Sequence, residues 1–93
     1  MNRTSPTVAR VAGVKIMVHY CDHTPPHVHL SKGQMDIVVD ILDPKLPPWA
    51  FSRADRRAVL TWIRAKTPDL LIAWGRASAG VSPGKIEPKE RRR

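Results

Sequence analysis

Residues 21–30 read Cys21-Asp22-His23-Thr24-Pro25-Pro26-His27-Val28-His29-Leu30, and they contain three of the four histidines and the only cysteine. Each proline fixes its own φ angle and lacks a backbone donor, and it also favours an extended conformation at the residue before it. We therefore expect a stiff turn that leads directly into a strand. Alternate side chains of a strand share a face, so His27 and His29 point to one side and Val28 and Leu30 to the other.

The composition is that of a small, basic, globular protein. The chain has 93 residues, of which 42% are hydrophobic, and its net charge is +8. This length predicts a single domain, and the positive charge favours nucleic acid or another acidic partner. A single cysteine excludes an internal disulfide and fits a reducing compartment. With no long apolar segment, we expect a cytoplasmic protein that does not span a membrane.

Two β-hairpins are predicted around the turn at residues 21–30. The first runs from Thr7 to Tyr20 and reverses at Ala12-Gly13, since hydrophobic and polar residues alternate on both sides of that pair. The second joins the strand that begins at His27 to a strand over residues 35–42. We expect these four strands to form one antiparallel sheet.

The register of the second hairpin follows from its expected turn at Lys32-Gly33. This turn places Leu30 opposite Met35 and His29 opposite Asp36. The apolar side chains then share one face, and the histidines share the other face with acidic residues. A slip of one residue would mix the two faces, so the hydrophobic pattern opposes it.

Two helices are predicted after a proline-rich linker over residues 43–49. Ser52 is the expected N-cap of a helix over residues 53–66, with Asp55 three residues on. Thr67 is the expected N-cap of a second helix over residues 68–79, with Pro68 at its first position.

The predicted fold class is therefore α+β: an antiparallel sheet of two β-hairpins, packed on one face by two C-terminal helices. Residues 1–79 form the expected single domain. Residues 80–93 are rich in Ser, Pro, Gly and charged side chains, and we expect a basic, disordered tail there.

The histidines support two kinds of chemistry. His27 and His29 are spaced so that both can bind one metal ion such as zinc, with His23 as a third ligand and Asp22 or Asp36 as alternatives. Without a metal, the same histidines can act as acid and base, oriented by Asp22 and Asp36. A purely structural role, in which the histidines cap the turn and cover an open sheet, is the remaining alternative.

A second group of residues predicts contacts to phosphate. Arginines fall in a narrow stripe of the first predicted helix, and two further basic residues lie in the first hairpin. The alternative is that the arginines form a solvated helix face. The residues are Arg10, Lys15, Arg53, Arg56, Arg57 and Arg64.

Three segments of the chain carry a resemblance to a known family. They are Pro6-Thr7-Val8 with the later Asp22-His23-Thr24-Pro25-Pro26-His27-Val28-His29, then Phe51-Ser52-Arg53, and finally Leu70-Leu71-Ile72-Ala73-Trp74-Gly75. Over residues 6–75 the sequence resembles domain-of-unknown-function family 4160, whose members are small prokaryotic α+β proteins. They are often encoded beside a protein of domain-of-unknown-function family 2442. That arrangement resembles a type II toxin–antitoxin pair, with this family in the toxin role.

The resemblance carries the family motif onto Asp22, His23, His27 and His29. Together with the histidines and the charge, it predicts a toxin that acts on RNA or another phosphate-bearing substrate, as a ribonuclease or metal-dependent hydrolase. An antitoxin-like protein of the 2442 type is the expected partner. The rival prediction is a non-catalytic module that binds protein or nucleic acid through the same face. Pairing of sheet edges would then allow a homo-oligomer.

Overall fold

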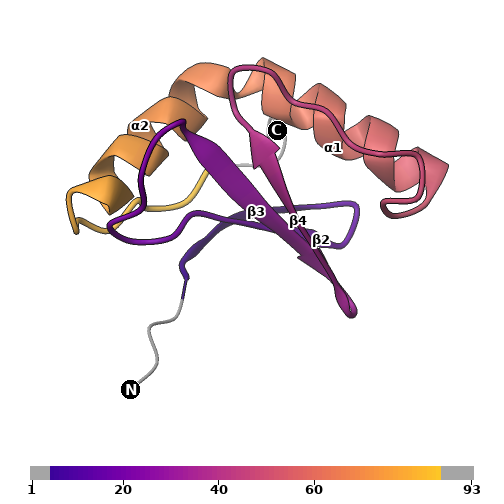
Figure 1. The fold of residues 1–93 in the computed structure, drawn as a ribbon, viewed down its shortest axis with the longest axis horizontal. Helices are drawn as coiled ribbons and strands as arrows, with labels where there is room; N and C mark the ends of the chain where they lie inside the picture. Colours follow the sequence, from indigo (N-terminus) through magenta and orange to yellow (C-terminus); the bar gives the residue numbers. More distant parts are fainter. Residues whose placement is uncertain (1–4, 87–93) are drawn as a thin grey trace, which may run out of the picture.

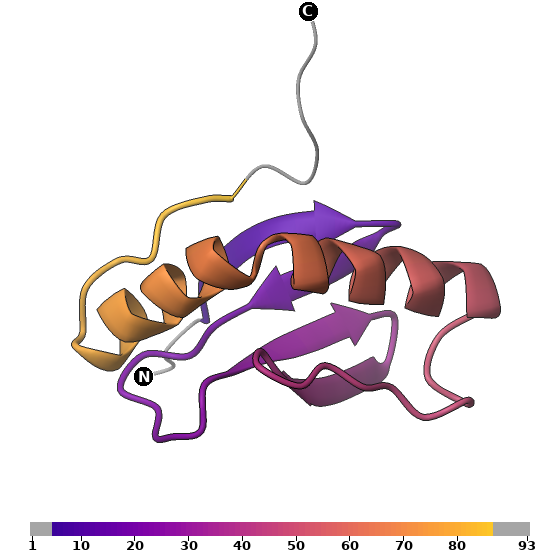
Figure 2. The same ribbon diagram turned by 90° about the horizontal axis from the view of Figure 1, so that it is seen from above.

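The computed structural model describes residues 5–86, which form a four-stranded sheet followed by two helices (Figure 1). The strands pair antiparallel in the order β1-β2-β3-β4, and both helices lie on one face of the sheet (Figure 2). The predicted α+β architecture is confirmed. The elements are β1 (Thr7–Val11), β2 (Val14–Met17), β3 (His27–Lys32), β4 (Met35–Asp40), α1 (Arg53–Ala65) and α2 (Thr67–Ser78).

The core lies between the helices and the face of the sheet that they cover. On β3, Val28 and Leu30 are fully buried in it, so the predicted alternation along this strand is confirmed. We call the other side of the sheet, which the helices leave uncovered, the open face. The fully buried side chains of the core include Val14, Ile16, Val28, Leu30, Ile41, Val59, Ile63 and Leu70.

Both hairpins reverse through two-residue turns. The first turn is Ala12-Gly13, as predicted, and both residues have positive φ angles of 53° and 77°. Two positive φ angles define a type I′ turn, which matches the twist of the strands that it joins. The second turn is Gly33-Gln34, where only Gly33 has a positive φ, of 62°, as in a type II′ turn.

The predicted register of the second hairpin is wrong by two residues. Lys32 pairs with Met35 and Leu30 with Ile37, because the turn lies one residue later than expected. A shift of two residues leaves every side chain on its predicted face, so the hydrophobic pattern is satisfied equally well by both registers. It does change the partners, because Asp36 lies opposite Ser31 and Val38 lies opposite His29.

The helix boundaries follow the predicted caps with one difference. The Ser52 hydroxyl accepts a hydrogen bond from the Asp55 N–H at 3.1 Å, and α1 begins at Arg53 as expected. Thr67 is not the N-cap of α2 but its first residue, and its hydroxyl donates back to the Ile63 carbonyl of α1 at 3.1 Å. Neither of these two described helices is long and apolar enough to cross a membrane.

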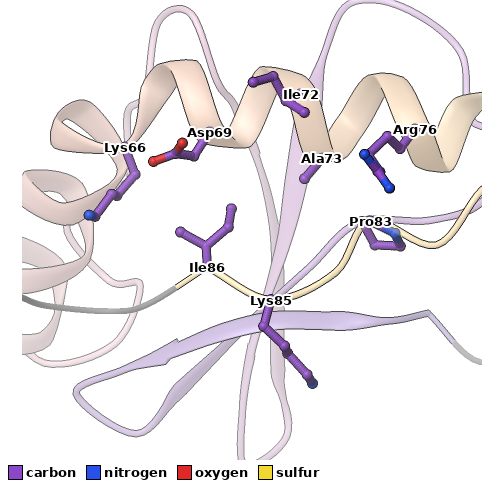
Figure 3. A pocket seen from close by; sticks show the side chains of 8 residues that line it. All are labelled: Lys66, Asp69, Ile72, Ala73, Arg76, Pro83, Lys85 and Ile86. Carbon is purple, nitrogen blue, oxygen red and sulfur yellow. The ribbon is translucent and has the colours of Figure 1, made fainter.

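The chain continues beyond α2 along the edge strand β1. The Ile86 N–H donates to the Val8 carbonyl at 2.7 Å, and the Ile86 side chain packs against the core. A groove separates this segment from α2, with Ile72 on one wall and Ile86 on the other (Figure 3). The expected tail begins at residue 80, but residues 81–86 differ from a disordered segment, since Ile86 has core side chains to contact. Residues 87–93 lie outside the described part of the chain.

Candidate functional site

The turn between β2 and β3 brings an aspartate to the open face. Its backbone is held at two points, because the Cys21 N–H donates to the Ala77 carbonyl near the end of α2 at 2.9 Å, and the Pro26 carbonyl accepts from Ile41 N–H at 3.1 Å. Cys21 itself is exposed and has a positive φ of 53°, so the chain reverses sharply just before Asp22. The last turn of a helix on the covered side therefore helps to position a residue of the open face.

Asp22 is the centre of the site. One carboxylate oxygen, Oδ2, lies 2.7 Å from His27 Nε2 and 3.6 Å from His29 Nε2. The other oxygen, Oδ1, accepts from the His23 N–H at 3.0 Å and lies 3.2 Å from His23 Nδ1. The predicted residues Asp22, His27 and His29 thus come together, and with His19 they form what we call the histidine cluster. The predicted residue His23 contacts Asp22 from the exposed outside of the turn and is not counted in the cluster.

His27 is held by acceptors on both sides of its ring. Nδ1 lies 2.7 Å from the Pro25 carbonyl oxygen, and Nε2 lies 2.7 Å from Asp22 Oδ2. A carbonyl and a carboxylate only accept hydrogen bonds, so in each contact the ring nitrogen is the donor. The side chain is only 12% exposed. His27 is therefore suited to orient Asp22.

His19 belongs to the site, although the sequence did not predict it as a site residue. Its ring stacks on that of His29, with centroids 3.5 Å apart and planes 8° from parallel. His19 follows the end of β2 and falls on the same face of its hairpin as Lys15 and Met17. The signal that could have found it is the pairing of β2 with β3, in which Met17 lies opposite His29.

The electrostatics of the cluster favour the neutral form of His29 and the ionised form of Asp22. Burial lowers the pKa of His29, and the neighbouring His19 lowers it further, while the contact with Asp22 opposes both effects in part. Burial alone would raise the pKa of Asp22, but the hydrogen bond from the His23 N–H and the interactions with His27 outweigh it and lower that pKa. The Nε2 atom of His29 is buried and has no hydrogen-bond partner among the described residues.

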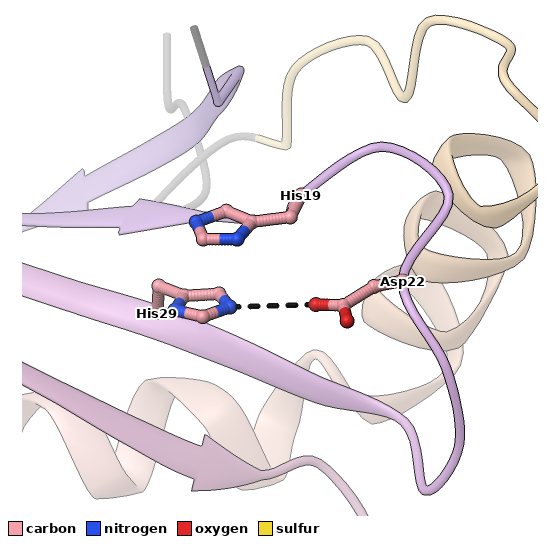
Figure 4. Close-up of side chains that lie close together, drawn as sticks. All are labelled: His19, Asp22 and His29. Carbon is pink, nitrogen blue, oxygen red and sulfur yellow. Dashed lines mark ion pairs between the residues drawn. The ribbon is translucent and has the colours of Figure 1, made fainter. Parts of the chain in front are cut away.

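Three side chains of the cluster have donor atoms that a single metal ion could contact. His19, Asp22 and His29 each offer one such atom, and these atoms all lie within 4.8 Å of one another (Figure 4). This group differs from the predicted set of His23, His27 and His29. The His23 side chain is 88% exposed on the outside of the turn, and both nitrogens of His27 already have partners.

A hollow of about 440 Å³ adjoins the cluster on the open face. His19 and His29 line one part of it, and Lys15 and Asp36 line the rest together with apolar side chains such as Met17. Asp36 was expected directly opposite His29, as its orienting carboxylate. That pairing is incorrect for the register reason given above, and it is Asp22 that contacts His29.

The six predicted phosphate-binding residues lie on two separate surfaces. Arg10 and Lys15 are paired across β1 and β2 on the open face, near the hollow. The other four residues are arginines of α1, on the opposite side of the sheet, and two of them contact the linker. Arg56 donates to the carbonyls of Pro48, Ala50 and Phe51, and Arg64 donates to that of Pro44 at 3.5 Å. Arg53 and Arg57 are exposed.

Fold and site together define a small α+β protein with a histidine–aspartate cluster on the open face of an antiparallel sheet. A family model described as Domain of unknown function (DUF4160) matches residues 13–75, which include the whole cluster. The chain therefore belongs to this family, as the sequence motifs predicted, although Pro6-Thr7-Val8 lies outside the matched segment. The comparisons with curated proteins and with solved structures gave no match.

Proposed function

We propose that this protein cleaves RNA, or another substrate with phosphodiester bonds, at the histidine cluster. The observation that carries the proposal is that His29, which lies 3.6 Å from the Asp22 carboxylate, lines the same hollow as the positively charged Lys15. Lys15 would attract the phosphate, and Arg10 beside it adds a second positive charge to the same face. The cluster would supply the groups that move protons during cleavage.

We propose further that this activity makes the protein the toxin of a two-component pair in the cytoplasm. The support is the similarity of its motifs to a family often encoded beside proteins of domain-of-unknown-function family 2442. A protein of that family would be the cognate antitoxin. Growth arrest on expression, relieved by co-expression of the neighbouring gene product, is the expected behaviour.

The test uses purified wild type and three single variants incubated with labelled RNA. We expect His29→Ala to lose at least about 100-fold in cleavage rate, the usual scale for removal of a group that transfers a proton. Lys15→Ala should raise KM, because it removes a phosphate contact. His23→Ala is the matched control, since its ring is 88% exposed, and it should retain activity within a few-fold.

The rival function is a binding module that uses the same face without catalysis. Val38 lies opposite His29 on the open face and is 56% exposed, so an apolar contact surface adjoins the cluster. RNA that the wild-type protein binds but does not cleave would favour this rival and refute the hydrolase.

A further inference from the structure

We propose that His19, Asp22 and His29 bind one divalent transition-metal ion, and that His27 is a positioning residue for the Asp22 carboxylate. Two imidazoles and one carboxylate form a donor set that suits Zn²⁺, Mn²⁺ or Fe²⁺ and leaves coordination positions open for water or substrate. The inference rests on the proposed function only where the metal is given a role in RNA cleavage. Metal binding itself is independent of that role.

The unpartnered Nε2 atom of His29 is the first support. A buried ring nitrogen without a hydrogen-bond partner is energetically costly. This atom lies 3.6 Å from Asp22 Oδ2, and a metal ion about 2.0–2.1 Å from each ligand atom fits between two donors at that separation.

The stacking of His19 on His29 shows which side chain must move when a metal ion binds. Two parallel rings 3.5 Å apart direct their lone pairs side by side, whereas ligands of one ion must point to a common centre. The His19 side chain therefore has to rotate out of the stack. His19 lies just after the end of β2 and makes no hydrogen bond with its ring among residues 5–86, so this rotation breaks the stacking contact without breaking a hydrogen bond.

His27 provides the outer support that metal sites require. Ligating carboxylates are usually fixed by a hydrogen bond from a neighbouring group, and loss of such a partner weakens metal affinity about 10–100-fold. His27 Nε2 donates to the same oxygen of Asp22 that faces His29, while its Nδ1 is fixed by the Pro25 carbonyl. The ring thus holds Asp22 Oδ2 in place.

The experiment is a titration of tag-free, metal-stripped protein with Zn²⁺ by calorimetry, and with Co²⁺ to record the absorption spectrum of the bound ion. We expect about one Zn²⁺ per chain, with affinity lowered at least about 100-fold in His19→Ala and in His29→Ala. His27→Ala should bind about 10–100-fold more weakly, and His27→Gln, which keeps a donor for Asp22, should recover part of that loss. His23→Ala should match wild type. Circular dichroism confirms that each variant folds.

Two results would overturn the site: no Zn²⁺ binding by folded wild type, or loss of binding in His23→Ala with retention in His19→Ala. The latter would support the set His23, His27 and His29 instead. A parallel RNA assay separates this inference from the proposed function. Cleavage by metal-free protein would exclude a role for the metal in catalysis and leave the proposed function intact. Zn²⁺ binding without any cleavage would support the site and refute the hydrolase.

Discussion

Along β3, Val28 and Leu30 point towards the helices and are fully buried, whereas His27 and His29 point to the open face and are 12% and 21% exposed. The covered face contains apolar side chains that contact one another on every side. The open face contains titratable side chains that are partly shielded, and the buried Nε2 atom of His29 has no hydrogen-bond partner within residues 5–86. A single strand therefore contributes to the core through one set of side chains and to the candidate site through the other.

The comparison also explains the different roles of the basic residues. On the helix side, Arg56 donates to three backbone carbonyls, one at the end of the linker and two just before α1, so its charge fixes this loop. On the open side, Lys15 lines the hollow beside His29. Positive charge near the candidate site is thus supplied by the sheet and not by α1.

The largest expected effect is on stability, from the covered face. Leu30→Ala should lower the free energy of unfolding by about 2–5 kcal/mol, because it opens a cavity in the core. His29→Ala on the same strand should change it by less than about 1 kcal/mol. Urea unfolding followed by tryptophan fluorescence measures both. If Leu30→Ala does not fold, Ile16→Val, with an expected loss of about 0.5–1.5 kcal/mol, replaces it. Equal losses at Leu30 and His29 would contradict the division between the faces.

A smaller effect is expected from the arginines of α1. Arg56→Ala leaves the carbonyls of Pro48, Ala50 and Phe51 without their donor and should cost about 1–3 kcal/mol in unfolding free energy. Arg57 is the next residue and its side chain is exposed, so Arg57→Ala should change the free energy of unfolding by about 0.5 kcal/mol or less. Thermal unfolding by circular dichroism distinguishes the two. A larger loss of stability for Arg57→Ala than for Arg56→Ala would contradict the role assigned to the hydrogen bonds of Arg56.

The smallest effect concerns pH. Because the pKa of His29 is lowered in the folded protein, unfolded chains take up a proton near pH 6.5 while folded chains do so only at lower pH. Wild type should therefore lose stability relative to His29→Gln as the pH falls from about 7.5 to about 5.5, measured with a chelator present. The pKa of Asp22 is lowered from its ordinary value of 3.8, so its effect on stability falls at a pH below this window. If the stability of the two proteins changes with pH in the same way, the pKa of His29 is not lowered by folding.

Much of the fold follows from local patterns in the sequence. Alternation along residues 27–30 correctly separates Val28 and Leu30 from the two histidines, because the side-chain period of a strand is two. Ala12-Gly13 correctly marks the first turn, and Ser52 correctly marks the start of α1. The convergence of Asp22, His27 and His29 is likewise predictable, since a short turn keeps residues near in sequence close in space.

Other features depend on distant parts of the chain and left no local signal. A period of two cannot distinguish registers that differ by two residues, so the backbone of Gly33-Gln34 places Asp36 opposite Ser31 instead of His29. His19 reaches the cluster through pairing of β2 with β3, and Asp22 is positioned by a hydrogen bond from its neighbour Cys21 to α2. The helices cover one face and so separate the arginines of α1 from the histidines. Local alternation thus assigns residues to faces, while strand pairing and helix docking set which of them meet.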